Sequence, residues 1–230
     1  MGGQACVFYG AAQVSKDIDV LLLADQANFT RLNAALAELH ASRIAVPPFD
    51  PAALDRGHAV HFRCQSPDVV GLRVDIMTRL REVPAFAVLW ERRTTFVDDS
   101  GVEYDLLCIP DLVQAKKTQR NRDWPVVELL VTIHYRENVA AARPPHVEFW
   151  LREARTPELL AELCHLFPVP ADDLQSKRPL LRLARDQRFD ELRTALDVEV
   201  REEQARDRAY WEPLRQELEV FRREHRNESE

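Results

Sequence analysis

Long apolar runs are absent from this chain of 230 residues. No stretch approaches the roughly 20 consecutive apolar residues that a membrane-spanning helix needs. The N-terminus also lacks the charged and then hydrophobic regions of a secretory signal peptide. We therefore expect a cytoplasmic protein that has no membrane partner.

Cysteine pairs at metal-binding spacing are missing as well. The four cysteines stand far apart, at Cys6, Cys64, Cys108 and Cys164. Because no CxxC pair occurs and each cysteine sits in an apolar run, they are predicted to be buried free thiols in a reducing compartment. His58 and His61 are close enough in sequence to share a zinc ion, but no second pair of ligands accompanies them, and His61 is predicted to lie in a strand.

Positive charge is in deficit, with 31 Lys and Arg against 38 Asp and Glu and a net charge of −7. Such a field opposes loose, sequence-independent binding to nucleic acid, although a local basic groove is compatible with it. Hydrophobic residues make up 46% and charged residues 30% of the chain, which is typical of a folded globular protein. The length suits one large domain or two small ones.

The most informative stretch of what is present covers residues 2–23. A glycine pair, Gly2 and Gly3, precedes a short apolar helix that is predicted over residues 4–9. The pair allows close backbone approach, and the free amides at the helix start are a natural seat for phosphate. A small turn then ends in Ser15 and Lys16.

Two acids follow at the entry of an apolar strand. Asp17 and Asp19 flank Ile18, and residues 20–23 are continuously apolar, which is typical of a strand covered on both faces. Since side chains alternate along a strand, the two carboxylates share one face and could hold a hard divalent cation. Alternatively, Asp17 begins a turn and Asp19 is an exposed strand residue without a ligand.

This order of glycine pair, short helix, Ser-Lys turn and Asp-Ile-Asp strand resembles the nucleotidyltransferase superfamily that includes DNA polymerase β. More narrowly, it resembles the AbiEii-like toxin and minimal-nucleotidyltransferase branches. The match is dense over residues 2–23 and sparse beyond them. Gln13 departs from it, since many such proteins carry Arg there and use the turn to contact substrate or phosphate. In relatives a helix and an apolar strand precede the glycine pair, so we expect a further segment upstream of Met1.

A third acid, Asp75, lies within the apolar run 71–77, which is predicted to be a strand. Burying a carboxylate without a partner is costly, so Asp75 must be compensated. Arg73, two residues away on the same face, offers a salt bridge. Alternatively, Asp75 joins Asp17 and Asp19 across adjacent strands and completes the three-carboxylate site that the resemblance implies.

A basic cluster occupies residues 116–122. On its own, such a cluster is usually a solvated helix face. The resemblance implies that Lys116 or Lys117 contacts nucleotide phosphate, and Arg120, four residues from Lys116, is expected to face the same side. Asp123 is expected to pair with Arg120 or Lys116 rather than to bind metal.

The remaining elements are predicted from periodicity and from residues that break it. Helices are expected over residues 29–42 (with Asn28 or Thr30 as the cap), from Pro110, and over 126–135, 146–155, 157–167, 177–195 and 197–226; paired strands over 59–64 with 71–77 and over 92–97 with 102–108; and a loop over 55–58. The Ala-, Arg- and Pro-containing segment 140–145 is the best candidate boundary.

The fold class is therefore expected to be α+β with a mixed sheet. The resemblance implies a nucleotidyltransferase-like catalytic domain at residues 1–139, followed by a helical C-terminal region at residues 140–230. The last long helix could dock on the body of its own chain or join a second subunit in a homodimer, because its apolar stripe is too irregular for a long coiled coil.

As a nucleotidyltransferase, the chain is expected to move a nucleoside monophosphate from an NTP to an acceptor and to release pyrophosphate. The resemblance implies Mg²⁺ or Mn²⁺ as cofactor, with Asp17, Asp19 and Asp75 as both metal ligands and catalytic residues. The residues expected to bind the nucleotide are Gly2, Gly3, Ser15, Lys16, Lys116 and Arg120. The acceptor stays open between RNA such as tRNA, a protein and a small molecule, and a toxin or a housekeeping role fits each of them.

Two other functions are compatible with the same residues. The first is a non-catalytic nucleotide-binding or protein-interaction role, because a fold does not decide a function. The second is a metal-dependent nuclease, which uses similar acids, but the order of Gly-Gly before Asp-Ile-Asp argues against it.

Overall fold

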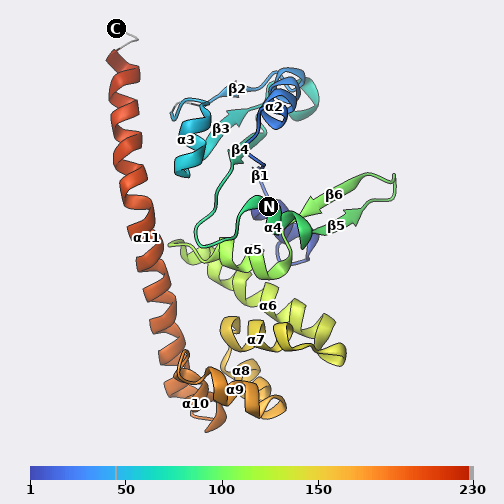
Figure 1. The fold of residues 1–230 in the computed structure, drawn as a ribbon, viewed down its shortest axis with the longest axis vertical. Helices are drawn as coiled ribbons and strands as arrows, with labels where there is room; N and C mark the ends of the chain where they lie inside the picture. The colour runs from blue at the N-terminus through green and yellow to red at the C-terminus, as the bar shows by residue number, and fades with distance from the viewer. Residues whose placement is uncertain (45, 228–230) are drawn as a thin grey trace. The chain divides into compact units, whose positions relative to one another are not determined.

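The computed structural model describes residues 1–44 and 46–227. They divide into two compact units: a sheet unit formed by Met1–Ala115 and the segment that starts at Arg208, and a helical unit formed by Lys116–Asp207. The expected α+β class is confirmed in this coarse form, since small sheets combine with many helices (Figure 1). The compositional boundary at 140–145 lies inside the helical unit, between α6 (Trp124–Asn138) and α7 (Pro144–Glu153).

The larger sheet has the strand order β1-β4-β3-β2. Its strands are β1 (Asp17–Leu21), β2 (Ser42–Arg43), β3 (Val60–Arg63) and β4 (Arg73–Met77). β1 runs parallel to β4, and β3 runs antiparallel to both β4 and β2, so the sheet is mixed as predicted. β3 and β4 confirm the two adjacent strands that the sequence predicts.

One face of this sheet is apolar and packs on helices (Figure 1). The core on this face joins strand residues to α2 (Gln26–Glu38) and α3 (Pro51–Arg56), and it includes Val60, Phe62, Val74, Ile76, Phe29, Leu36 and Leu54. Along β3 and β4 these apolar residues alternate with His61, Arg73 and Asp75. The period of two therefore turns the charged residues to the opposite face of the sheet.

β1 lacks the double cover that its apolar run predicts. In the described part of the chain it is an edge strand, and all five of its residues are half-buried. Val20 and Leu22 pack against the apolar core, whereas Leu21 lines a pocket. The run is therefore apolar because one side of it packs in the core and the other side lines a pocket. It does not indicate a central strand.

The start of α2 differs from the prediction because a residue further upstream caps it. The carboxylate of Asp25 accepts a hydrogen bond of 2.7 Å from the backbone N–H of Asn28, so the helix begins at Gln26. The predicted caps Asn28 and Thr30 are wrong, since both residues lie inside the helix.

The loop predicted at 55–58 is wrong in its first half, because α3 continues to Arg56. Asp50 caps this helix by accepting a hydrogen bond from a backbone N–H of the first turn, and Pro51 supplies a fixed φ at the first position. The helix ends at Gly57, whose φ of 105° lies in the left-handed region that glycine adopts readily.

The sheet unit contains further elements around the larger sheet. These are α1 (Gly2–Phe8), α4 (Phe86–Glu91), α5 (Ile109–Lys116, which reaches the unit boundary) and the antiparallel pair β5 (Thr94–Val97) and β6 (Glu103–Leu106). The predicted hairpin is confirmed, and Asp98 closes its turn by accepting hydrogen bonds from the backbone N–H groups of Ser100 and Val102.

The helical unit is built from α6, α7, α8 (Pro157–Leu166), α9 (Pro168–Leu174), α10 (Leu180–Arg185) and the first part of α11 (Phe189–Asn227). Proline stands in the first turn of α6 to α9, where its missing N–H sacrifices no helical hydrogen bond. The buried side chains include Leu130, Trp150, Leu160, Leu163, Leu181 and Leu192. The single helix predicted over 177–195 is wrong, because a turn separates α10 from α11.

α11 packs on its own chain within each unit. In the sheet unit, Glu217 lies 2.8 Å from His58 Nε2 and 2.6 Å from an Arg56 guanidinium nitrogen, and Leu214 is buried. In the helical unit, Leu192 is fully buried. Docking on the body is therefore confirmed for this helix, and a homodimer through it stays a prediction.

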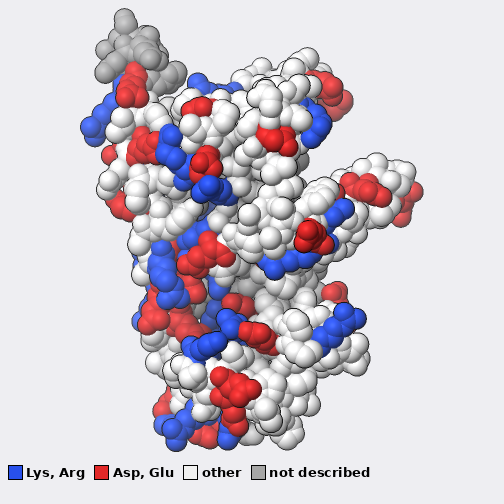
Figure 2. Space-filling model, in the orientation of Figure 1, with Lys and Arg blue, Asp and Glu red and all other residues white. Residues whose placement is uncertain are grey.

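The structure also bears on the expectations for the cysteines, for membrane-spanning helices and for surface charge. The four cysteines are free, three of them buried and Cys108 half-buried. Among the described residues, no helix combines the length and apolar character that crossing a membrane requires. On the face shown in Figure 2, acidic and basic side chains are interspersed rather than gathered into one broad basic surface.

A half-buried histidine in the helical unit is held in its neutral form. His134 of α6 accepts a hydrogen bond of 2.8 Å at Nδ1 from the indole N–H of Trp150 in α7. Burial, together with nearby His146, lowers the pKa of His134 to about 4.

We expect the helical unit to lose stability as the pH falls from about 6.5 towards 4, because over that range the unfolded chain binds a proton at His134 that the folded chain does not. Above that range neither state binds the proton, so this contribution becomes constant. His134→Gln should flatten the slope, whereas the control His165→Gln, at an exposed histidine of the same unit, should leave it unchanged. Thermal melts across the range measure this, and an unaltered slope in His134→Gln would contradict it.

Candidate functional site

The charged face of the larger sheet carries all three acids of the predicted site. The strand register pairs Asp19 of β1 with Asp75 of β4, and His61 of β3 with Asp75. Paired residues on neighbouring strands point to the same face, and Asp17 shares it because it lies two residues before Asp19. We call Asp17, Asp19, His61, Arg73 and Asp75 the polar sheet face.

Asp75 is nearly buried, with an exposed fraction of 7%, and it has two partners. The guanidinium group of Arg73 donates from Nε to Oδ1 and from Nη2 to Oδ2, both at 2.7 Å. His61 Nδ1 lies 2.8 Å from Oδ1 of the same carboxylate. The predicted salt bridge to Arg73 is therefore present, together with the register that places Asp75 beside Asp19.

The pKa values on this face follow from these contacts. Burial alone would favour the neutral acid, but the hydrogen bonds from His61 and Arg73 outweigh it and hold the pKa of Asp75 below its ordinary value. The hydrogen bond to Asp75, with help from the charges of Asp17 and Asp19, raises the pKa of Arg73. Arg73 thus serves as the common counter-charge of all three carboxylates.

The polar sheet face matches a divalent cation in the kind of ligand but not in their arrangement. Carboxylate oxygens are the ligands that Mg²⁺ and Mn²⁺ prefer. However, no group of three His, Cys, Asp or Glu side chains in the described ranges is placed to hold a metal ion. Arg73 engages both oxygens of Asp75, so only Asp17 and Asp19 offer open carboxylate oxygens here.

The glycine pair allows Asp19 to approach the start of α1. Gly2 has a φ of 69°, and a Cβ added to it would lie 1.8 Å from Asp19 Oδ2. The backbone N–H of Gly3 donates to the same oxygen at 3.3 Å. The expectation that this amide is free for phosphate is therefore wrong for Gly3, because the carboxylate of Asp19 takes its hydrogen bond.

The turn before β1 is fixed by Ser15. Its hydroxyl donates to the backbone oxygen of Asp17 at 2.9 Å, and a Cβ on Gly3 would meet its Oγ at 2.3 Å. Ser15 therefore positions the strand start in this structure. Lys16 is exposed beside it and is the cation of this turn that remains open to solvent.

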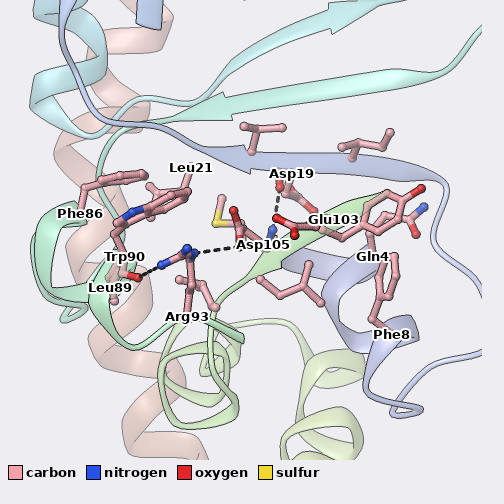
Figure 3. A pocket seen from close by; sticks show the side chains of 16 residues that line it. Gln4, Phe8, Asp19, Leu21, Phe86, Leu89, Trp90, Arg93, Glu103 and Asp105 are labelled. Carbon is pink, nitrogen blue, oxygen red and sulfur yellow. Dashed lines mark hydrogen bonds and ion pairs between the residues drawn. The ribbon is translucent and has the colours of Figure 1, made fainter. Parts of the chain in front are cut away.

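A pocket of about 590 Å³ lies along the free edge of β1 (Figure 3). Residues 18–21 line one side of it and residues 103–107 of the β6 segment line the other. Asp19 belongs to this lining and so connects the pocket to the polar sheet face. Its volume suits one small-molecule ligand.

Three aromatic side chains, Phe8, Phe86 and Trp90, belong to the rest of the pocket wall. Phe86 and Trp90 of α4 stack with their ring centroids 5.7 Å apart, and the guanidinium carbon of Arg93 lies 4.0 Å from the centre of the Trp90 ring. Arg93 also pairs with Asp105 at 2.8 Å, so its charge is neutralised. Sequence patterns do not predict this pocket, because residues 83–91 carry no clear periodicity and only the fold brings them to β1.

The three cations predicted in the segment 116–120 belong to the helical unit. Lys117 is buried and pairs with Glu153 at 3.1 Å, which leaves Lys116 as the candidate for the predicted phosphate contact. Arg120 pairs with Asp123 at 2.9 Å, which confirms the partner predicted for Asp123. Lys116 is the last residue of α5 and Arg120 lies outside that helix, so the helical spacing argument for a shared side is wrong.

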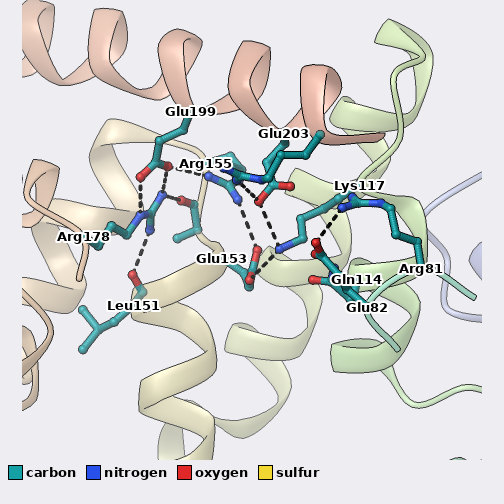
Figure 4. A network of polar contacts seen from close by, with 12 residues as sticks. Arg81, Glu82, Gln114, Lys117, Leu151, Glu153, Arg155, Arg178, Glu199 and Glu203 are labelled. Carbon is teal, nitrogen blue, oxygen red and sulfur yellow. Dashed lines mark hydrogen bonds and ion pairs between the residues drawn. The ribbon is translucent and has the colours of Figure 1, made fainter. Parts of the chain in front are cut away.

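Lys117 is one member of a buried network of charged side chains (Figure 4). In the helical unit, Arg178 donates to both carboxylate oxygens of Glu199 and to the backbone oxygens of Leu151 and Ala154. Arg155 bonds Glu199 as well, at 2.6 Å. The network ties α11 to α7, which indicates a structural role for the charges.

No family model, curated protein or solved structure matches the chain. The polar sheet face and the pocket beside it are therefore the features that indicate a function.

The glycine contact at Asp19 can be tested with a matched pair of substitutions. Gly2→Ala and Gly10→Ala place the same side chain at positive φ, 69° and 75°, but only at Gly2 does the new Cβ collide with another residue. Overpacking typically costs about 1–3 kcal/mol. We expect Gly2→Ala to lower the free energy of unfolding by about that much more than Gly10→Ala in urea titrations. Equal losses would show that Asp19 does not press on the helix start.

Proposed function

We propose that this protein is a nucleotidyltransferase that moves a nucleoside monophosphate from an NTP to an acceptor and releases pyrophosphate. One observation carries the proposal, namely the register that places Asp19 beside Asp75 on the same face as Asp17. Transfer of this kind asks little covalent chemistry of a protein and depends on positioning and charge. Carboxylates brought together from separate strands, next to a glycine-flanked helix start, meet that requirement.

The residues of the polar sheet face have separate tasks in this proposal. Asp17 and Asp19 would hold the divalent cation at the reacting end of the nucleotide, and the Gly3 N–H fixes the direction of Asp19. Exposed Lys16 offers a positive charge to the phosphates. Asp75 would take the proton from the acceptor hydroxyl. While Arg73 holds it, Asp75 is a weak base, because its pKa is kept low.

Mg²⁺ or Mn²⁺ remains part of the proposal as the cofactor that the resemblance implies. A divalent cation would neutralise charge on the triphosphate. Asp17 and Asp19 are the open carboxylates that would be its ligands, and Asp75 could join them only after releasing Arg73.

The pocket beside Asp19 supports a small apolar or aromatic group as part of the bound substrate. Trp90 and Phe86 present flat apolar surfaces there, and the one arginine of the lining is already paired. We propose that the pocket holds either the base of the nucleotide or an apolar part of the acceptor, with the reacting group towards Asp19. The acceptor class stays open between RNA such as tRNA, a protein and a small molecule.

A second candidate function is non-catalytic binding of a nucleotide or of a protein partner on the same fold. The observation that favours it is the bidentate pairing of Asp75 with Arg73, which removes one of the three carboxylates from the site. Nucleotide binding without pyrophosphate release would select this candidate.

Asp17→Asn and Asp19→Asn should each lower transfer by about 100-fold or more, because each removes a carboxylate that would hold the cation that offsets the charge of the triphosphate. Transfer is measured by incubating the protein with each NTP and Mg²⁺ in the presence of cell RNA, protein and small molecules. Released pyrophosphate is quantified, and nucleotide adducts are identified by mass spectrometry.

Asp68→Asn is the matched control for these variants, because it removes one negative charge at an exposed position away from the strands. It should leave transfer unchanged. Circular dichroism spectra should be the same for all three variants. Full transfer in folded Asp17→Asn or Asp19→Asn would overturn the proposed site.

A further inference from the structure

The charged face of the sheet already contains a cation of its own. We propose that Arg73 occupies the place of a divalent cation, and that the face binds such a cation only together with a nucleotide whose phosphates take over Arg73. This inference deepens the proposed function and rests on it. It explains why the three carboxylates share a face and yet form no metal-binding group in the described residues.

The geometry at Asp75 excludes simultaneous ligation. Each oxygen of the carboxylate accepts a hydrogen bond of 2.7 Å from Arg73, and His61 Nδ1 lies 2.8 Å from Oδ1. Mg²⁺ requires an oxygen at about 2.0–2.1 Å. A cation at that distance would be repelled by the positive charge of the guanidinium group. Asp75 therefore becomes a ligand only when Arg73 leaves it.

Arg73 needs a new partner once it leaves. The other acids on the face, Asp17 and Asp19, are themselves the open cation ligands, so a bound cation competes with Arg73 for them too. A phosphate group presents two oxygens to the planar guanidinium fork in the same way as a carboxylate does. The phosphates of the arriving nucleotide are therefore the anions that can receive Arg73 at the same moment.

The side chains differ in the freedom that such an exchange requires. The Arg73 side chain is 38% exposed, whereas the Asp75 side chain is only 9% exposed. Asp75 also belongs to β4, which is hydrogen-bonded on both sides by β1 and β3. Arg73 can thus swing towards solvent while the carboxylate stays in place.

Direct binding of Mn²⁺ tests the proposal, because the electron paramagnetic resonance signal of free Mn²⁺ falls as the ion binds. The full chain is titrated alone and with the α,β-methylene analogues of ATP, CTP, GTP and UTP in turn. For the unaltered protein we expect Mn²⁺ to bind at least about tenfold more tightly with one of the analogues, beyond the Mn²⁺ that the analogue binds by itself. For Arg73→Gln we expect tighter Mn²⁺ binding without an analogue and little further gain with one.

Arg63→Gln is the matched control. Arg63 is on the same face and pairs with Arg73 in the strand register, but it contacts none of the three acids. This variant loses the same charge as Arg73→Gln does. Because Arg63 contacts none of the acids, the variant should bind Mn²⁺ as the unaltered protein does. Adding Asp75→Asn to Arg73→Gln should remove the tight Mn²⁺ binding, because the released ligand is then missing.

Two results would overturn the inference: equal Mn²⁺ affinity of Arg73→Gln and the unaltered protein without nucleotide, or no gain for the unaltered protein with any analogue. Should Arg73→Gln fail to fold, Arg73→Lys decides, because lysine keeps the charge but cannot form the two-pronged contact. It should then bind Mn²⁺ alone more tightly than the unaltered protein does. Coupled Mn²⁺ binding without any nucleotide transfer would overturn the transferase function alone, and transfer without coupling would overturn this inference alone.

Discussion

The ion pair between Arg73 and Asp75 is the contact on which the charged face of the sheet depends. A carboxylate on a central strand must be compensated, and the bidentate guanidinium does so with good geometry. The same guanidinium offsets the negative charges of Asp17 and Asp19 on the neighbouring strand. Three acids can therefore stand together on one small sheet, which without a counter-charge would repel one another.

A second constraint acts at the other side of Asp19. Residues with side chains would not fit at the start of α1. A Cβ atom on Gly2 would overlap Asp19, and a Cβ atom on Gly3 would overlap Ser15. The glycines therefore serve to bring a helix and a strand into contact. Asp19 is held between the Gly3 amide and the neighbouring strand, and one side of it opens to the aromatic pocket. This position connects charge on the sheet with an apolar space large enough for a ligand.

Local patterns predicted the elements that depend on local physics. The short apolar runs 59–64 and 71–77 predicted β3 and β4, and the spacing of two residues placed Arg73 on the same face as Asp75. The Asp/Ser/Gly turn predicted the β5–β6 hairpin in the same way. The cap at Asp25 was missed because Asn28 and Thr30 are equally good capping residues by type, and only the backbone geometry selects among them.

The candidate site was predictable in its members but not in its contacts. Sequence spacing placed Asp17 with Asp19 and offered two roles for Asp75, and the structure combines the register of one with the salt bridge of the other. Lys117 could not be assigned, because its burial depends on Glu153, which approaches it only through helix packing. The aromatic pocket was out of reach for the same reason, since α4 and β6 reach β1 through tertiary contacts alone.

The sheet unit is discontinuous in sequence, since the segment from Arg208 onwards returns to it after the helical unit is complete. Glu217 on that segment pairs with His58, which is almost fully buried, and Tyr210 lies against Gly57. Gly57 and His58 therefore stay uncovered on the ribosome until the segment from Arg208 onwards has emerged. Folding of the sheet unit thus requires a segment that is made after the helical unit, whereas the helical unit is one continuous stretch of the chain.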